Sequence, residues 1–218
     1  MPDRASSSVG ARVILIVVAV AVPLVPLAFW LYELVPMMPA PLQSFPFALY
    51  LIARAFALTG FVLMFYQFVL SARLPFLESV FKRPKLMGTH RTVGKVGFIL
   101  MLLHGVILLA TEPVLYTEKT LGLVALILLT TGVTAAWFFK PLKLSLKTWR
   151  AVHLVAYLVF PLVFIHAISL GSTVLGYEPV YWLFVVLFAG YCLIVVYRVV
   201  RLVRARGSSP GARTASAQ

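Results

Sequence analysis

Residues 87–110 read MGTHRTVGKVGFILMLLHGVILLA, an apolar run that carries His90 and His104. A second apolar run reads WRAVHLVAYLVFPLVFIHAISLG over residues 149–171, and it carries His153 and His166. The chain of 218 residues has four histidines, and all of them lie in these two runs. Each run is long enough to cross a bilayer as a helix, so each predicted helix presents one imidazole near either end.

The composition is that of an integral membrane protein. Apolar residues make up 62% of the chain and charged residues only 11%, far from the balance of a water-soluble domain. The sequence therefore predicts an all-α, multi-pass bundle of six transmembrane helices in a lipid bilayer. The six windows that are long and apolar enough to span the hydrocarbon core cover approximately residues 12–35, 47–71, 89–111, 120–140, 149–171 and 179–202.

The charged residues alternate by side along the predicted bundle, and the formal net charge is +13. Lys and Arg cluster before the first window, after every second window and in the C-terminal tail, whereas the other connections hold Glu33, Glu112, Glu118 and Glu178 against one cation, Lys119. By the positive-inside rule, both termini are expected on the cytoplasmic side of the plasma (inner) membrane. Topology thus explains the basic charge without a nucleic-acid partner, and the basic face could also receive an acidic cytosolic protein.

The six windows define one expected domain, residues 12–202. A disordered N-terminus, residues 1–11, is expected before it, and a basic, disordered cytoplasmic tail, residues 203–218, after it. The first window is expected to stay as a membrane helix, because prolines interrupt it and no small-residue cleavage site follows. Residues 74–81, LPFLESVF, could form a short amphipathic helix on the inner surface. The single Cys192 excludes a disulfide framework and covalent haem attachment.

The histidine spacing predicts two metal centres at different depths. The first pair is fourteen residues apart and the second thirteen, which corresponds to about 21 Å and about 19.5 Å along a helix. Because the third and fifth helices run in the same direction, His90 is expected level with His153 on the inner side, and His104 with His166 on the outer side. Imidazoles on both faces of a haem leave no open position for oxygen, which suits electron transfer. Zinc fits less well, since no Asp, Glu or Cys accompanies the histidines.

The fifth helix does not match this model if it is regular. Fourteen residues bring His104 within about 40° of the face of His90, whereas thirteen leave His166 about 140° from the face of His153. Pro161 lies between the last two histidines, and a proline can bend or locally rewind a helix. We expect Pro161 to correct part of the mismatch, and side-chain rotamers or a displaced outer haem to absorb the rest.

Three arginines are candidate partners of the haems. Arg54 lies a few residues inside the outer end of the second helix. It either snorkels to the outer headgroups or faces the bundle, where it would pair with a haem propionate or an anionic substrate. Arg91 and Arg150 flank the inner histidines. They either reflect positive-inside placement or pair with the propionates of the inner haem.

The segments THRTVGKVGFILMLLHG and WRAVHLVAYLVFPLVFIHA resemble the ferric reductase-like transmembrane domain, which iron reductases, NADPH oxidases and stand-alone bacterial relatives share. The resemblance covers roughly residues 45–202. It implies six helices that hold two b-type haems through the four histidines. It also implies that Arg54 lies near the outer haem and the oxygen site, which makes this arginine a candidate catalytic residue.

Oxidases and reductases of that family continue into an FAD and NADPH domain, whereas this chain ends soon after the sixth window and has no GxGxxG motif. The resemblance therefore implies an oxidoreductase membrane subunit that receives electrons from a cytosolic flavin or NAD(P)H reductase, so FAD or FMN would belong to the partner. The acceptor outside could be a ferric chelate, oxygen or a periplasmic reductase.

Other functions remain open at this point. A similar stand-alone protein is the haem-binding membrane subunit of the methionine sulfoxide reductase system, although that subunit does not keep all four histidines. The chain could also be a haem-binding or structural membrane protein without catalytic turnover. A cytochrome b that reacts with quinone is the remaining alternative.

Overall fold

The computed structural model describes residues 3–39 and 44–207, and no strand occurs among them. Six helical spans are long and apolar enough to cross a membrane, as the sequence predicts. These spans are formed by α1 (Asp3–Leu34), α3 (Phe45–Ser71), α5 (Arg83–Thr111), α6 (Thr117–Trp137), α7 with α8 (Leu146–Leu154 and Ala156–Leu170) and α10 (Glu178–Gly207). Short helices lie in the connections: η1 (Val35–Met37), α4 (Pro75–Val80) and α9 (Ser172–Gly176).

The outermost helices are longer than the sequence indicates. Helix α1 begins at Asp3, within the segment expected to be disordered, and α10 continues to Gly207, beyond the start of the expected tail. The physical reason is cooperativity: once an apolar run has formed a helix, each further residue adds a hydrogen bond at little cost, so the helix extends into polar sequence. The rest of the predicted disorder, residues 1–2 and 208–218, lies outside the described residues.

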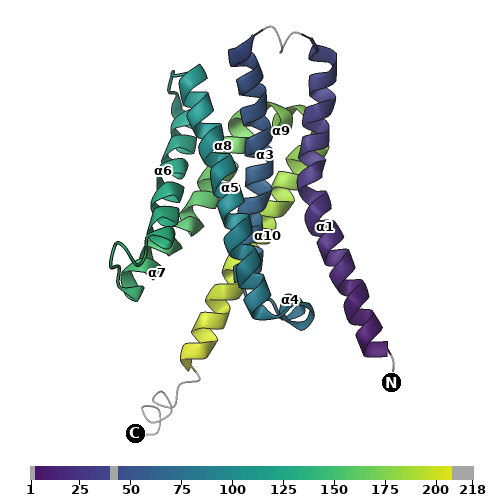
Figure 1. Ribbon diagram of the computed structural model, residues 1–218, viewed down its shortest axis with the longest axis vertical. Coiled ribbons are helices and arrows are strands. Elements are labelled where there is room, and N and C mark those ends of the chain that lie inside the picture. Colours follow the sequence, from purple (N-terminus) through teal and green to yellow (C-terminus); the bar gives the residue numbers. More distant parts are fainter. Residues whose placement is uncertain (1–2, 40–43, 208–218) are drawn as a thin grey trace.

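The short helix α4 lies where the sequence predicts an amphipathic segment. Figure 1 shows α4 at the same end of the bundle as the start of α1 and the end of α10, with α9 toward the opposite end. We call the first the basic end, because segments 73–85 and 140–150 together with the end of α10 carry most of the Lys and Arg residues. The second is the acidic end, which holds Glu33, Glu112, Glu118 and Glu178.

Helices α3 and α5 make the most extensive contact of any helix pair in the described residues, and glycines contribute to it. A Cβ atom on Gly97 would lie 3.3 Å from Cβ of Leu63, and one on Gly60 would lie 2.6 Å from the sulfur of Met101. Small residues at helix crossings let backbones approach in the membrane, where packing rather than water exclusion drives association. Packing thus explains much of the glycine content that the sequence shows around the first two histidines.

Aromatic side chains fill the core between α3, α8 and α10. Phe61 is 1% exposed, and its ring stacks on Phe184 with centroids 4.1 Å apart and on Phe160 with centroids 4.9 Å apart. Most apolar residues on the opposite faces of the helices are exposed, as expected of surfaces that contact lipid. Helices α5 and α6 lie beside this core, with α5 against α3 and α6 against α8 (Figure 1).

The fifth span is interrupted at Val155, not at Pro161. Val155 has φ −57° and ψ −27°, its N–H donates to the carbonyl of Val152 (3.1 Å), and its own carbonyl accepts from Leu158 (2.8 Å). Such three-residue hydrogen bonds mark a 3₁₀ turn, which rotates the chain by about 120° per residue instead of 100°. The extra rotation moves His166 toward the face of His153, so this turn performs part of the correction that we expected from Pro161.

Pro161 lies inside α8 and changes its hydrogen bonding instead. Because proline has no N–H, the carbonyl of Tyr157, four residues earlier, lacks its helical donor. The hydroxyl of Tyr191 in α10 donates to that carbonyl over 2.6 Å. A side chain of the last helix thus satisfies the backbone group that the proline leaves free.

The Tyr191 hydrogen bond predicts a non-additive pair of substitutions. Tyr191→Phe should lower the free energy of unfolding by about 1 kcal/mol, because it leaves a buried carbonyl unpaired. In a Pro161→Ala background the alanine N–H can fill the same role, so Tyr191→Phe should then have little effect. Thermal unfolding in detergent of the two single variants and the double variant measures this coupling. Equal losses in both backgrounds would contradict it.

Candidate metal centres on two pairs of histidines

The structure brings the four histidines together in two pairs. The rings of His90 (α5) and His153 (α7) have centroids 6.4 Å apart at an interplanar angle of 71°. Those of His104 (α5) and His166 (α8) are 6.3 Å apart at 69°. These are the pairs that parallel helices predict from the sequence. We call them the inner pair and the outer pair.

The separation within each pair suits two ligands on opposite sides of one metal ion. An imidazole nitrogen lies about 2.0–2.1 Å from a first-row metal and about 1.1–1.2 Å from its own ring centre, which places the two ring centres roughly 6.2–6.6 Å apart. Among the described residues, no third His, Cys, Asp or Glu joins either pair to complete a protein metal site. A metal held here would take its other ligands from elsewhere, and a porphyrin supplies four in a plane between two axial imidazoles.

Backbone carbonyls orient both rings of the outer pair. Nδ1 of His104 lies 2.9 Å from the carbonyl oxygen of Ala53, and Nδ1 of His166 lies 2.8 Å from that of Glu118. A carbonyl can only accept, so each Nδ1 carries the proton and donates it. In a neutral imidazole with this hydrogen bond, Nε2 is the unprotonated nitrogen, which is the tautomer found in metal-binding histidines.

Gly122 of α6 allows His166 to take this position. A Cβ atom on Gly122 would lie 2.7 Å from Cε1 and 2.8 Å from Nδ1 of the His166 ring. Any residue larger than glycine at this position would displace the imidazole. The sequence did not single out Gly122, because its importance depends on a contact between α6 and α8.

Side chains rather than carbonyls orient the inner pair. The ring of Trp149 stacks on His153 with centroids 5.4 Å apart and an interplanar angle of 13°. The side-chain amide of Gln67 lies 3.0 Å from Nδ1 of His90. With its amide oriented to satisfy all of its neighbours, Gln67 donates from its nitrogen to Nδ1 and to the carbonyl oxygen of His90, and its oxygen accepts from the N–H of Gly94, so Gln67 fixes the position of the His90 ring. Neither Trp149 nor Gln67 was predicted as a site residue.

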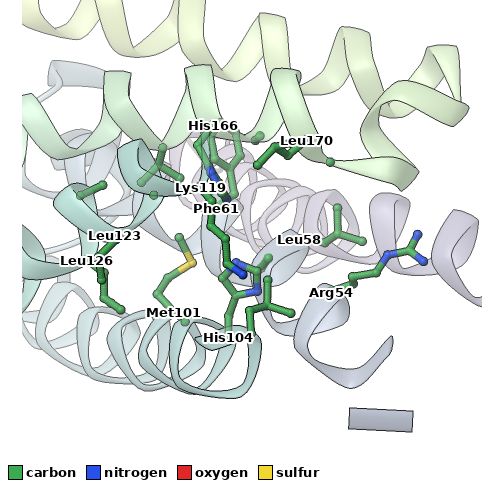
Figure 2. Close-up of a pocket in the computed structure, with 18 of the residues that line it drawn as sticks. Arg54, Leu58, Phe61, Met101, His104, Lys119, Leu123, Leu126, His166 and Leu170 are labelled. Atoms are coloured by element: carbon green, nitrogen blue, oxygen red, sulfur yellow. The ribbon is translucent and has the colours of Figure 1, made fainter. Parts of the chain in front are cut away.

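Each pair lines a cavity, and the two cavities differ in size. The inner cavity has a volume of about 740 Å³, within the range of roughly 300–1,000 Å³ that is usual for cofactor pockets. The outer cavity measures about 180 Å³ and is drawn in Figure 2, where the side chains of Phe61, Leu58 and Met101 lie close to the histidines. The inner pair therefore fits a haem in both ring spacing and volume, whereas the outer pair fits it in ring spacing.

Arg54 is turned into the bundle and is only 12% exposed in its side chain. Its Nη2 donates to Oε2 of Glu33 (2.6 Å) and to Oγ1 of Thr173 (2.6 Å), and that hydroxyl donates to the same carboxylate over 3.1 Å. Arg54 also lines the outer cavity. In Figure 2 its guanidinium lies at the margin of the cavity and points away from His104. Of the two alternatives for Arg54, the structure therefore shows the one in which the side chain faces the bundle. Its partner is Glu33, which the sequence did not reveal.

The other cations are distributed differently from the prediction. Arg91 lines the inner cavity. Arg150 is exposed and is not among the residues that line either cavity, so its pairing with a propionate of the inner haem stays a prediction. Arg198 of α10 lines the inner cavity in its place. At the acidic end, Lys119 is 7% exposed, lines the outer cavity and donates to the carbonyl of Glu112.

Comparison with protein-family models, with curated proteins and with solved structures gives no match for this chain. The ferric reductase-like resemblance therefore stays a prediction from the residues. The functional argument depends on the geometry of the two histidine pairs and on the cavities that they line.

The contact of Gly122 with His166 gives a test of the outer site. Gly122→Ala should displace the imidazole and reduce the haem bound at the outer pair by at least half, with the inner site unaffected. Gly176→Ala is a matched control, because a Cβ atom there meets nothing within 4 Å. Haem content per protein, measured by pyridine haemochrome assay, distinguishes the two variants. Full haem content in Gly122→Ala would contradict the assigned position of His166.

Proposed function

We propose that this protein is the membrane subunit of a ferric reductase-like electron-transfer system. It would hold two b-type haems, one between His90 and His153 and one between His104 and His166. Electrons would pass from a cytosolic flavin or NAD(P)H reductase to an acceptor outside, such as a ferric chelate, oxygen or a periplasmic reductase. The observation that carries the proposal is that two histidine rings face each other near each end of the bundle, with centroids 6.3–6.4 Å apart.

A haem iron with two imidazole ligands supplies one-electron chemistry without an open metal position. The residues of this chain would bind the two haems and orient the histidines that hold them. The carbonyls of Ala53 and Glu118 fix the protonated nitrogen of the outer histidines, while Trp149 and Gln67 hold the inner ones. The aromatic core beside α3 and α8 excludes water between the two levels.

The orientation in the plasma membrane is part of the proposal. The basic end would face the cytosol, since Lys and Arg are retained there by the positive-inside rule. Both termini and the inner pair would then lie on the side of the electron donor, whose FAD or FMN this chain does not need to bind. The same cations would attract an acidic surface of that donor.

Single histidine substitutions test the two-site model. His104→Ala or His166→Ala should remove the outer haem and keep the inner one, and His90→Ala or His153→Ala should do the reverse. Each variant should therefore contain about half of the wild-type haem. Haem stoichiometry and reduced-minus-oxidised spectra of the purified proteins measure this.

The two sites also serve as controls for each other in that experiment. A wild-type protein without low-spin haem that a flavin reductase can reduce would overturn the proposal. Loss of all haem in both His90→Ala and His104→Ala would instead show that the two pairs do not act as separate sites.

The Arg54–Glu33 ion pair predicts opposite effects on the outer haem. Glu33→Gln leaves a positive charge beside the outer cavity and should raise the midpoint potential, because a cation stabilises the reduced state. Arg54→Leu leaves the carboxylate and should lower the potential and slow electron delivery to the outside acceptor. The double variant loses one positive and one negative charge, so the midpoint potential of its outer haem should lie near that of the wild type.

Redox titration and stopped-flow reduction check this charge effect, with electron entry into the inner haem as the internal reference. Identical potentials in all four proteins would mean that Arg54 and Glu33 only join α1, α3 and α9. The role of Arg54 at the outer site would then have to be given up.

A further inference from the structure

The inner cavity contains a buried hydroxyl that has no partner in the described part of the chain. The Oη atom of Tyr157 is inaccessible and makes no hydrogen bond there, and Tyr157 lines the cavity beside His90 and His153. Other tyrosines of the bundle are satisfied: the hydroxyls of Tyr66, Tyr191 and Tyr197 all donate to backbone carbonyls. A buried hydroxyl is costly to leave unpaired, so this one points to a ligand.

A guanidinium lies next to this tyrosine. Cζ of Arg198 is 5.5 Å from the centre of the Tyr157 ring, and Nη1 donates to Oγ of Ser71 over 3.4 Å. All three side chains line the inner cavity. The ion pairs among the described residues do not include Arg198. Arg198 of α10 is thus a half-buried cation without a carboxylate partner. Tyr157 of α8 places a hydroxyl without an acceptor in the same cavity.

We infer that Tyr157 and Arg198 form a carboxylate-binding site, and that its ligand is a propionate of the haem held by His90 and His153. The inference rests on the proposed function. A carboxylate accepts hydrogen bonds from both a phenol and a guanidinium, and it supplies the charge that Arg198 lacks. Since haem carries its propionates on one edge of the ring, a single site at one wall of the cavity also fixes the rotation of the macrocycle.

Arg198 therefore takes the role that the sequence suggested for Arg150. Both lie near the basic end, but only Arg198 lines the cavity of the inner pair. An anionic lipid headgroup has the same charge as a propionate and reaches the same end of the bundle. The experiment must separate these two sources of an anion.

The test compares haem with its dimethyl ester, in which both propionates are blocked. Protein in the His166→Ala background, which keeps the inner pair complete, is stripped of haem and reconstituted with either compound. The rate of haem transfer to apomyoglobin is then measured in Tyr157→Phe and Arg198→Gln. Both variants should lose haem roughly ten- to a hundredfold faster than the background protein, the factor expected for a hydrogen bond to a charged group.

With the dimethyl ester, the same variants should match the background protein. Tyr197→Phe and Arg201→Gln are the matched controls, since both side chains hydrogen-bond to the carbonyl of Arg73 and neither lines the inner cavity. These controls should release haem and ester at the background rate.

Several outcomes would overturn the site. Unchanged haem loss in Tyr157→Phe and Arg198→Gln would do so, and so would an equal acceleration with haem and ester, which indicates damage to the fold. The measurement is repeated in nanodiscs with and without phosphatidylglycerol, and an acceleration with both haem and ester that occurs only when this lipid is present would instead identify a headgroup as the ligand. Failure of the background protein to bind haem with a bis-imidazole spectrum would remove the proposed function itself, and this site with it.

Discussion

One arrangement underlies the proposed function: two imidazoles from different helices face each other at the same depth, twice. Parallel helices with nearly equal histidine spacing are necessary for this but not sufficient. The rings must also present the right nitrogen. At the outer pair the carbonyls of Ala53 and Glu118 select it by accepting the Nδ1 proton. These acceptors belong to α3 and to the first turn of α6. The side chains of His104 and His166 therefore join α5 to α3 and α8 to α6.

The irregular features of the bundle lie around these histidines. The 3₁₀ turn at Val155 supplies rotation that a regular helix of thirteen residues lacks. Gly122 gives the space in which the His166 ring lies against α6. Pro161 leaves a carbonyl free, and Tyr191 binds it from α10.

The sequence was sufficient for the six spans and for which histidines meet, since apolar length and helix direction are one-dimensional properties. It was insufficient for Arg54 and Arg150. The Glu33 partner of Arg54 lies on another helix, and the exposure of Arg150 depends on how α7 is rotated. The spacing of residues predicts how deep a side chain lies along a helix, but not the direction in which it points around the helix axis. A break such as that at Val155 also rotates the α7 side chains relative to those of α8. Gln67, Gly122 and Tyr157 were missed for the same reason: their importance comes only from the neighbours that they contact.

The two levels differ in how their charges are balanced, and in the proposed function this difference would affect the direction of electron transfer. At the outer cavity each cation has a glutamate: Arg54 has Glu33, and Lys119 lies 3.9 Å from Glu112. At the inner cavity, Arg91, Lys95 and Arg198 belong to none of the ion pairs among the described residues. Uncompensated cations would favour an electron at the inner level and hinder its passage outward. Propionate carboxylates at the inner level would offset most of this charge, so the ligand that completes the site at Tyr157 and Arg198 would also bring the potentials of the two levels closer together.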